Sequence, residues 1–461
     1  MFKSEVYVNR RDALRKSMSG GIVIILGNVD SPMNYAANPF HFRQDSDFLY
    51  FFGLDLHGLA GVMDIDSGRD YIFGDDVDVD DIIWMGPQPS IKELAAKAGV
   101  KETFPVNNLA IMIEKAISGG RKIHFLPPYR GENKMTLGAI LKENPCQMKS
   151  KASDELIRSV IALRSYKEPC EIEEIEKAID IAYDMHTTAM QMCKPGVKEQ
   201  EIFGAIEGIA LAQGMGPSFP IILSINGQTL HNHNHNNILT TGRMMVTDAG
   251  AETNMHYASD ITRTTPVGGK FDSRQKEIYE IVLEANIRAI QSAGPGKSNR
   301  DLHLEACRVV AGGLKALGLM KGDIDEAVAQ GAHALFMPHG LGHMMGLDVH
   351  DMEGLGENYV GYNDQVQRSE QFGFAFLRFG LPFKPGHVFT IEPGCYFIPE
   401  LMGKWKSEKL HTEYINYDKA EKYLDFGGVR IEDDVLITES GHKVLGKPIP
   451  KTVEEVEAIC S

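Results

Sequence analysis

Long apolar runs are missing from this 461-residue sequence. The first apolar run, Ile22 to Leu26, is short, and no run reaches the roughly 18 apolar residues that a membrane-spanning helix needs. The N-terminal residues are charged and do not resemble a secretory signal. We therefore expect no membrane span and no signal peptide.

Cysteines are few, and their spacing suggests no pairing. The sequence has 6 of them, without a C-x-x-C motif or a regular spacing. Such a pattern is typical of free thiols in a reducing compartment rather than of a disulfide framework. We expect a cytoplasmic protein.

Positive charge is also in deficit. The 47 lysines and arginines face 63 aspartates and glutamates, which gives a net charge of −16. Nucleic acid and anionic membrane surfaces are therefore disfavoured as partners. No G-x-G-x-x-G follows the first strand-like segment, residues 21–28, so a dinucleotide site is not supported.

Three histidines, by contrast, lie close together in the glycine-rich segment 337–351. They are His339, His343 and His350. A single histidine in an apolar run is usually a core residue, but glycines allow close backbone approach and three histidines at this spacing suggest a site. One could bind a metal while the other two face a substrate.

Acidic residues interrupt apolar, strand-like segments elsewhere in the chain. They are Asp248, Asp260, Glu392 and Glu432. Aspartate is depleted in strands, although any one of these residues could be an ordinary salt-bridged strand residue. The segments that carry Asp248 and Asp260 should form a hairpin with the two carboxylates side by side. Residues 428–438 alternate regularly and predict one strand.

Four ionised carboxylates could not converge without cations. Two carboxylates about 4 Å apart repel by roughly 4 kcal/mol at an effective dielectric constant near 20. Two divalent ions would balance four such charges. Four carboxylates and one imidazole suit Mn²⁺, Co²⁺ or Zn²⁺, and an ion pair of this kind activates a bridging water. The pattern predicts a dinuclear metal site.

The chain divides into two expected domains. Strands alternate with helices over residues 1–155, which predicts an N-terminal α/β domain. A long amphipathic helix should begin at Pro169, a second after the capping residue Asp272, and a third near Asp301. We expect residues 156–461 to form the second, α+β domain.

Six sequence blocks resemble those of the Xaa-Pro peptidases, aminopeptidase P and prolidase, in the same order. The blocks are Asp248-Ala-Gly, Ser259-Asp-Ile-Thr-Arg-Thr, His339-Gly-Leu-Gly-His, Leu347-Asp-Val-His-Asp, Ile391-Glu-Pro-Gly and Val429-Arg-Ile-Glu-Asp-Asp. The N-terminal segments Phe42-Arg-Gln-Asp-Ser-Asp-Phe and Ile83-Trp-Met-Gly are also similar to that family. The resemblance implies a creatinase/prolidase-like α/β domain, for substrate access and oligomerisation, followed by a pita-bread catalytic domain.

The resemblance also implies which residues hold two metal ions, most often Mn²⁺ in this family. They are Asp248, Asp260, His343, Glu392 and Glu432. Asp260 and Glu432 would bridge both ions. Asp248 would bind one ion, and His343 with Glu392 the other, with Co²⁺ and Zn²⁺ as alternative metals.

The expected reaction is hydrolysis of the N-terminal Xaa-Pro bond of a peptide that has proline at its second position, with a metal-bridged hydroxide as the nucleophile. Glu392 would move the proton, His350 would stabilise the oxyanion, and His339 would hold the substrate. Arg430 would support the site by pairing with carboxylates. His231 is the match for a further family histidine, with His233 and His235 as alternatives.

Two further readings stay open. Arg378 and the insertion 399–426 resemble prolidases, in which such an arginine binds the C-terminal carboxylate of a dipeptide. A more remote reading is a non-catalytic peptide-binding module, although every expected ligand position here is acidic or histidine. Tyr396 should also contact substrate, and Trp84 should help to close the pocket, across a subunit interface in a homodimer or homotetramer.

Overall fold

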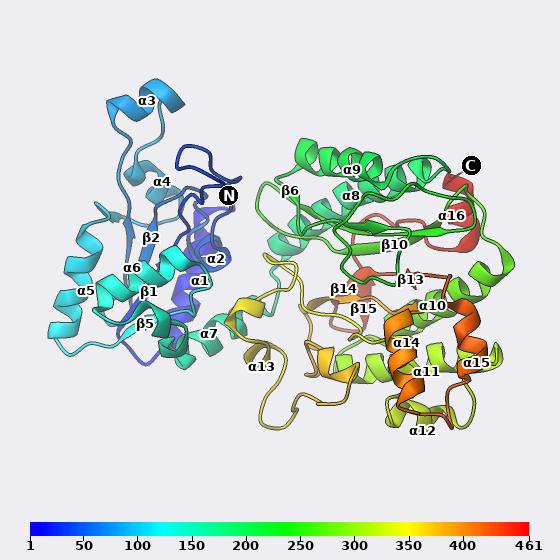
Figure 1. The fold of residues 1–461 in the computed structure, drawn as a ribbon. Coiled ribbons are helices and arrows are strands. Elements are labelled where there is room, and N and C mark those ends of the chain that lie inside the picture. The colour runs from blue at the N-terminus through cyan, green and yellow to red at the C-terminus, as the bar shows by residue number, and fades with distance from the viewer. Residues whose placement is uncertain (461) are drawn as a thin grey trace. The chain divides into compact units, whose positions relative to one another are not determined.

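The computed structural model describes residues 1–460, which form two compact units (Figure 1). The first unit contains Met1–Arg164 and Met352–Tyr359, and the second contains Ser165–Asp351 and Val360–Ser461. Among the described residues, no helix is long and apolar enough to cross a membrane. Each of the 6 cysteines is a free thiol, as the sequence predicts.

The first unit is built on one mixed sheet with the strand order β4-β3-β2-β1-β5. Its strands are β1 (Ile22–Leu26), β2 (Ala60–Asp64), β3 (Arg69–Phe73), β4 (Glu102–Phe104) and β5 (Ile123–Phe125). Its helices are α1 (Ser4–Ser17), α2 (Ser46–Phe52), α3 (Val79–Met85), α4 (Ile91–Lys97), α5 (Asn108–Ser118), α6 (Gly131–Leu141), α7 (Asp154–Arg164) and the 3₁₀ turns η1 (Pro145–Gln147), η2 (Lys149–Lys151) and η4 (Glu353–Leu355). The apolar face of α5 packs on the buried side chains of β1, β2 and β3. The expected α/β character of this part is confirmed.

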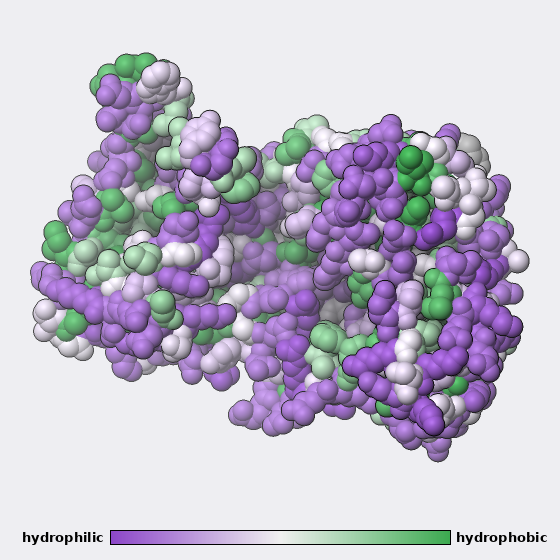
Figure 2. Space-filling view, viewed as in Figure 1, coloured by the Kyte–Doolittle hydropathy of each residue, from purple (hydrophilic) through white to green (hydrophobic). Residues whose placement is uncertain are grey.

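Helix α3 differs from the other helices of this unit because it has no buried residue. Apolar surface gathers over it (Figure 2), and Ile83 and Trp84 are 70% and 85% exposed. Its N-terminus is closed by a capping box between Asp78 and Asp81. Local hydrogen bonds, rather than packing, therefore hold this helix.

The second unit carries the long amphipathic helices. They are α8 (Pro169–Met192), α9 (Glu199–Gln213), α10 (Ser273–Ser292) and α11 (Asn299–Ala316). Shorter helical segments are α12 (Ile324–Ala329), α14 (Pro399–Ser407), α15 (Tyr417–Ala420), α16 (Val453–Ile459), η3 (Ala332–Leu335), η5 (Phe374–Phe376) and η6 (Glu421–Tyr423), and α13 (Glu357–Val360) runs from the first unit into the second. The predicted starts at Pro169 and after Asp272 are confirmed, the latter with a capping box to Gln275.

Short strands of the second unit lie beside these helices. They are β6 (Gly216–Pro217), β7 (Ile222–Ser224), β8 (Met244–Ala249), β9 (Ala251–Glu252), β10 (Ile261–Pro266), β11 (Val388–Ile391), β12 (Gly394–Tyr396), β13 (Gly428–Arg430), β14 (Asp433–Ile437) and β15 (His442–Val444). The hydrogen-bonded orders are β10-β8-β7, β11-β14-β15, β12-β13 and β6-β9.

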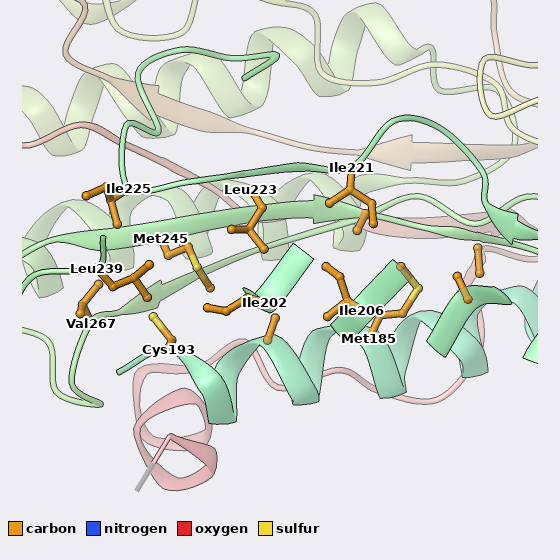
Figure 3. Packing of buried hydrophobic residues seen from close by; sticks show 14 of the residues in the cluster. Met185, Cys193, Ile202, Ile206, Ile221, Leu223, Ile225, Leu239, Met245 and Val267 are labelled. Carbon is orange, nitrogen blue, oxygen red and sulfur yellow. The ribbon is translucent and has the colours of Figure 1, made fainter. Parts of the chain in front are cut away.

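The first half of this unit has a continuous apolar core between helices and strands (Figure 3). Met185 on α8 and Ile202 and Ile206 on α9 face Leu223 on β7 and Met245 on β8. Helix α10 packs in turn against α11. The apolar core and the α10–α11 packing support the strands that carry or flank the expected metal-binding carboxylates.

Residues 428–438 do not form the single strand that their alternation predicts. They divide into β13, which pairs with β12, and β14, which pairs with β11. Pro393 explains the division, because proline has no N–H to donate and interrupts the ladder on the neighbouring segment. The break leaves Glu392 and Glu432 between strands, where their side chains can turn towards a common site.

Candidate metal centre

The β8–β10 hairpin holds two of the acidic residues. Asp248 lies in β8, and Asp260 directly precedes β10. In the register of the hairpin, Thr262 is opposite Asp248. Both aspartates are buried, as the predicted hairpin requires.

The glycine-rich loop of the histidines lies against β11. The backbone N–H of His343 donates to Thr390 Oγ1 at 3.1 Å, and the N–H of Thr390 donates to the His343 carbonyl at 2.9 Å. A Cβ at Gly342 would lie 1.9 Å from the Thr390 carbonyl oxygen. Glycine is therefore required for the close approach that brings His343 to the acidic residues.

The ring of His343 is oriented for metal binding. Its Nδ1 lies 3.1 Å from the Met344 carbonyl, which can only accept a hydrogen bond. Nδ1 therefore carries the proton in the neutral ring, and Nε2 directs its lone pair towards carboxylates. Nε2 lies 3.3 Å from Asp260 Oδ2 and 3.8 Å from Glu392 Oε1. Burial, followed by the charge of His350, lowers the pKa of His343, which favours the neutral ligand form.

The donor atoms converge closely enough for shared ions. One donor atom each of Asp260, His343 and Glu432 lies within 4.8 Å of the others. A second oxygen, Asp248 Oδ1, is buried and has no hydrogen-bond partner among residues 1–460. These residues line one cavity of about 540 Å³, together with Glu392.

The carboxylates carry the electrostatic conflict that the sequence predicts. Burial, followed by repulsion from Glu432 and Asp248, raises the pKa of Asp260. Burial, followed by Glu392 and Asp248, raises the pKa of Glu432. Burial raises the pKa of Glu392 to about 8, although the charge of Arg430 acts in the opposite direction. Divalent cations would remove this conflict, so the donor set fits such ions.

Arg430 holds the other side of the site. Its guanidinium pairs with Asp248, donates from Nη1 to Tyr396 Oη at 2.9 Å, and donates from Nε to Thr262 Oγ1 at 3.1 Å. Thr262 Oγ1 then donates to Glu432 Oε2 at 2.6 Å. One arginine therefore orients two of the expected metal ligands, one directly and one through a threonine.

The remaining predicted histidines lie at the cavity in different ways. His339 Nε2 is 3.0 Å from Tyr396 Oη, and burial, followed by Arg430, lowers the pKa of His339 to about 4. His350 stands against His343, with ring centroids 4.1 Å apart. His231 and His233 both line the cavity. His235 does not, because its ring stacks on Phe203 and its Nδ1 bonds to the Leu223 carbonyl.

Arg378 also lines the cavity. Tyr396 is buried and bonds to Arg430 and His339. Trp84 lies on α3 of the first unit.

Three residues of the site were not predicted from the sequence: Thr262 and the exposed cavity residues Phe372 and Phe376. Thr262 stands two residues after Asp260 on an alternating strand, which could have indicated that both face one side.

Family models match both parts of the chain. Metallopeptidase family M24 matches residues 173–439, and the aminopeptidase P N-terminal domain matches residues 7–124. The human Xaa-Pro dipeptidase is 31% identical over 97% of this chain and 90% of its own length. A probable Xaa-Pro aminopeptidase of Fusarium vanettenii is 31% identical over 98% of this chain and 95% of its own length.

Solved structures of Escherichia coli aminopeptidase P are similar throughout. A variant in complex with substrate has a TM-score of 0.82 and 28% identity, covering 100% of this chain and 98% of that chain. A zinc-substituted form in complex with product has a TM-score of 0.81 and 29% identity with the same coverage. The chain belongs to metallopeptidase family M24 and is an aminopeptidase P-like metallopeptidase with an aminopeptidase P N-terminal domain.

Proposed function

We propose that this metallopeptidase removes the N-terminal residue from peptides with proline at the second position, using two divalent ions, most readily Mn²⁺. The observation that carries the proposal is the convergence of four buried or half-buried carboxylates and one oriented imidazole in one cavity. The related probable Xaa-Pro aminopeptidase of Fusarium vanettenii supports the same substrate class.

In this proposal the five expected ligands are distributed over the two metal ions. Asp248, Asp260, His343, Glu392 and Glu432 would hold the two ions, with Asp260 and Glu432 shared between them, Asp248 on one side and His343 with Glu392 on the other. When bound, the ions supply Lewis-acid polarisation and a nucleophile at neutral pH. Co²⁺ and Zn²⁺ would satisfy the same donors.

The protein groups supply positioning and proton transfer. Glu392 accepts the proton of the attacking water and passes it towards the proline nitrogen, the role of a general base that then acts as a general acid. His350 donates a hydrogen bond to the developing oxyanion. His339, held in one tautomer by Tyr396 and the Gly340 carbonyl, packs beside the proline ring.

Arg378 supports a second candidate, a dipeptidase. It lines the same cavity as the carboxylates, where a guanidinium could pair with the C-terminal carboxylate of a dipeptide. The human Xaa-Pro dipeptidase is a relative of comparable similarity.

The N-terminal domain, residues 1–155 as expected from sequence, would control access to the site and the assembly of a homodimer or homotetramer. The exposed Ile83 and Trp84 on α3 are suited to contact a second copy, so that Trp84 would help to close a neighbouring pocket. Light scattering of the wild type and of Trp84→Ala tests this assembly. Unchanged mass and unchanged kinetics in the variant would exclude the role of Trp84.

Product analysis by mass spectrometry tests the substrate. Mn²⁺-loaded protein is given Gly-Pro and Arg-Pro-Pro side by side, with Arg-Ala-Pro as the matched control. Cleavage of Arg-Pro-Pro with little action on Gly-Pro supports the aminopeptidase. Cleavage of Gly-Pro alone supports the dipeptidase, and cleavage of Arg-Ala-Pro at the same rate would contradict both.

A further inference from the structure

A second group of metal-binding side chains lies outside the carboxylate site. His303 and Cys307 are on α11, and His333 is in η3. All three are buried, with exposed fractions of 0%, 0% and 1%. We call them the α11–η3 cluster.

The cluster has the geometry of a compact donor set. His303 and Cys307 are four residues apart, which places them on the same face of the helix. Cys307 Sγ lies 3.5 Å from His303 Nε2. One donor atom from each of the three residues lies within 4.8 Å of the others.

Ordinary packing accounts for only part of this arrangement. His303 stacks on Phe374, with ring centroids 5.0 Å apart, and its Nε2 can accept a weak hydrogen bond from the Cys307 thiol. His333 has no such explanation. Both of its ring nitrogens are buried and lack a hydrogen-bond partner among residues 1–460. A buried polar ring without partners is costly and rare, and an ion between these side chains would take up the lone pair of one of its two nitrogens.

The two imidazoles are in the protonation state that binds a metal, whereas the thiol has to lose its proton. Burial, followed by the charge of His333, lowers the pKa of His303 to about 3. Burial also lowers the pKa of His333 to about 4 and raises the pKa of the Cys307 thiol. Both imidazoles are therefore neutral near pH 7. Binding would release one proton from the thiol and form the thiolate ligand.

We propose that the α11–η3 cluster is an additional metal site that takes a borderline transition-metal ion, with Zn²⁺ as the best match. Two imidazoles and one thiolate are typical zinc donors, with the fourth position left for a water or another oxygen. A hard ion such as Mn²⁺ prefers oxygen donors and would not occupy it. Zn²⁺ or Co²⁺ could therefore occupy either site, whereas Mn²⁺ would occupy only the carboxylate site.

The location suggests what the ion does. Helix α11 already contacts the histidine loop, because Asn299 Nδ2 donates to the Gly342 carbonyl at 3.2 Å. The segment η3 lies just before that loop, and the Met337 N–H donates to the His333 carbonyl at 3.0 Å. An ion bound by both α11 and η3 would hold in place the start of the loop that carries His339 and His343.

Cobalt spectroscopy separates this site from the carboxylate site. Sulfur is absent from the donors proposed for the carboxylate site, so a thiolate-to-cobalt charge-transfer band can arise only from a cysteine site. Wild-type protein is produced with Co²⁺ present during folding, because the donors are buried. The band is expected, and its absence would overturn the proposal without the need for any variant.

Matched cysteine variants assign the band. Cys307→Ala should lose it together with one equivalent of Co²⁺ or Zn²⁺, whereas Cys193→Ala should keep both. Cys193 is a suitable control because it is equally buried, in the core beside α8 and β8. In Mn²⁺-loaded protein the metal content of Cys307→Ala should equal that of the wild type. Loss of the band in Cys193→Ala, or an unchanged Zn²⁺ content in Cys307→Ala, would contradict the assignment.

Discussion

The hydroxyl of Tyr396 joins Arg430 to His339. Arg430 Nη1 donates to Tyr396 Oη at 2.9 Å, and Oη lies 3.0 Å from His339 Nε2. Because His339 Nδ1 is 2.8 Å from the Gly340 carbonyl, Nδ1 holds the proton and Nε2 accepts from the tyrosine. A side chain that is expected to contact substrate therefore fixes a neighbouring histidine.

Tyr396→Phe should lower kcat/KM by about 10- to 100-fold, since a hydrogen bond in a charged network contributes about 1.5–3 kcal/mol. Metal content should not change, because Tyr396 contacts none of the expected ligands directly. Tyr279→Phe is the matched control: its buried hydroxyl donates to the Lys451 carbonyl, away from the cavity. Equal kinetic effects of the two variants would contradict the role of Tyr396.

Glu392→Gln should lower kcat by about 10²- to 10⁴-fold, because the amide cannot carry the proton to the leaving nitrogen. Single-turnover product formation in Mn²⁺-saturated protein measures the chemical step, and metal analysis shows whether both ions remain. Activity within tenfold of the wild type would refute the proton-transfer role.

Thr262→Val should weaken metal binding by about 10- to 100-fold, because groups that orient a ligand have effects of that size. The variant loses the 2.6 Å hydrogen bond to Glu432 and the contact with Arg430 Nε. Titration calorimetry with Mn²⁺ gives the affinity. Thr264→Val is the control. The hydroxyl of Thr264, two residues along the same strand, bonds only to the backbone of Arg430, so its loss should leave the Mn²⁺ affinity unchanged.

Much of the carboxylate site could be predicted from the sequence. Asp248 and Glu392 are informative because each interrupts or ends an apolar strand, where a charge needs a reason. The start of the helix that follows Asp272 could also be predicted, because its capping residues Asp272 and Gln275 are only three positions apart in the sequence. Features of this kind can be predicted because they depend on residues that are close together in the sequence.

Features that depend on tertiary packing could not be predicted in this way. The division of residues 428–438 into two strands follows from Pro393 on the neighbouring segment. His303 and His333 are far apart in sequence, and each alone resembles a core histidine. Only the packing of η3 against α11 brings them together.

The metal-free protein should lose stability as the pH rises from about 7 to 8, above the range in which the buried histidines, whose pKa values are lowered, make the free energy of unfolding rise with pH. The folded-state pKa of Glu392 is raised to about 8, and those of Asp260 and Glu432 are also raised. Between the unfolded and folded pKa values the native state binds more protons than the unfolded state, so the free energy of unfolding falls with pH. Metal competes with these protons, so stabilisation by Mn²⁺ should grow over the same range.

Melting temperatures at several pH values, with chelator or with Mn²⁺, test this pH dependence. Asp260→Asn with Glu432→Gln should make the decline in the chelated protein shallower, because neither amide titrates and only Glu392 of the three groups still does. A chelated wild type that becomes more stable towards pH 8 would contradict the prediction.

Gly342→Ala should abolish metal binding at the histidine loop while leaving the rest of the fold in place. The added Cβ would lie 1.9 Å from the Thr390 carbonyl oxygen and 2.9 Å from Thr390 Oγ1, so the loop must move away from β11. That movement breaks the pairing of His343 with Thr390 and takes Nε2 away from Asp260 and Glu392. Gly403→Ala is the control, because a Cβ there meets no atom within 4 Å. Mn²⁺ affinity and circular dichroism of both variants check the expectation, and wild-type affinity in Gly342→Ala would show that close contact at this position is not what places His343.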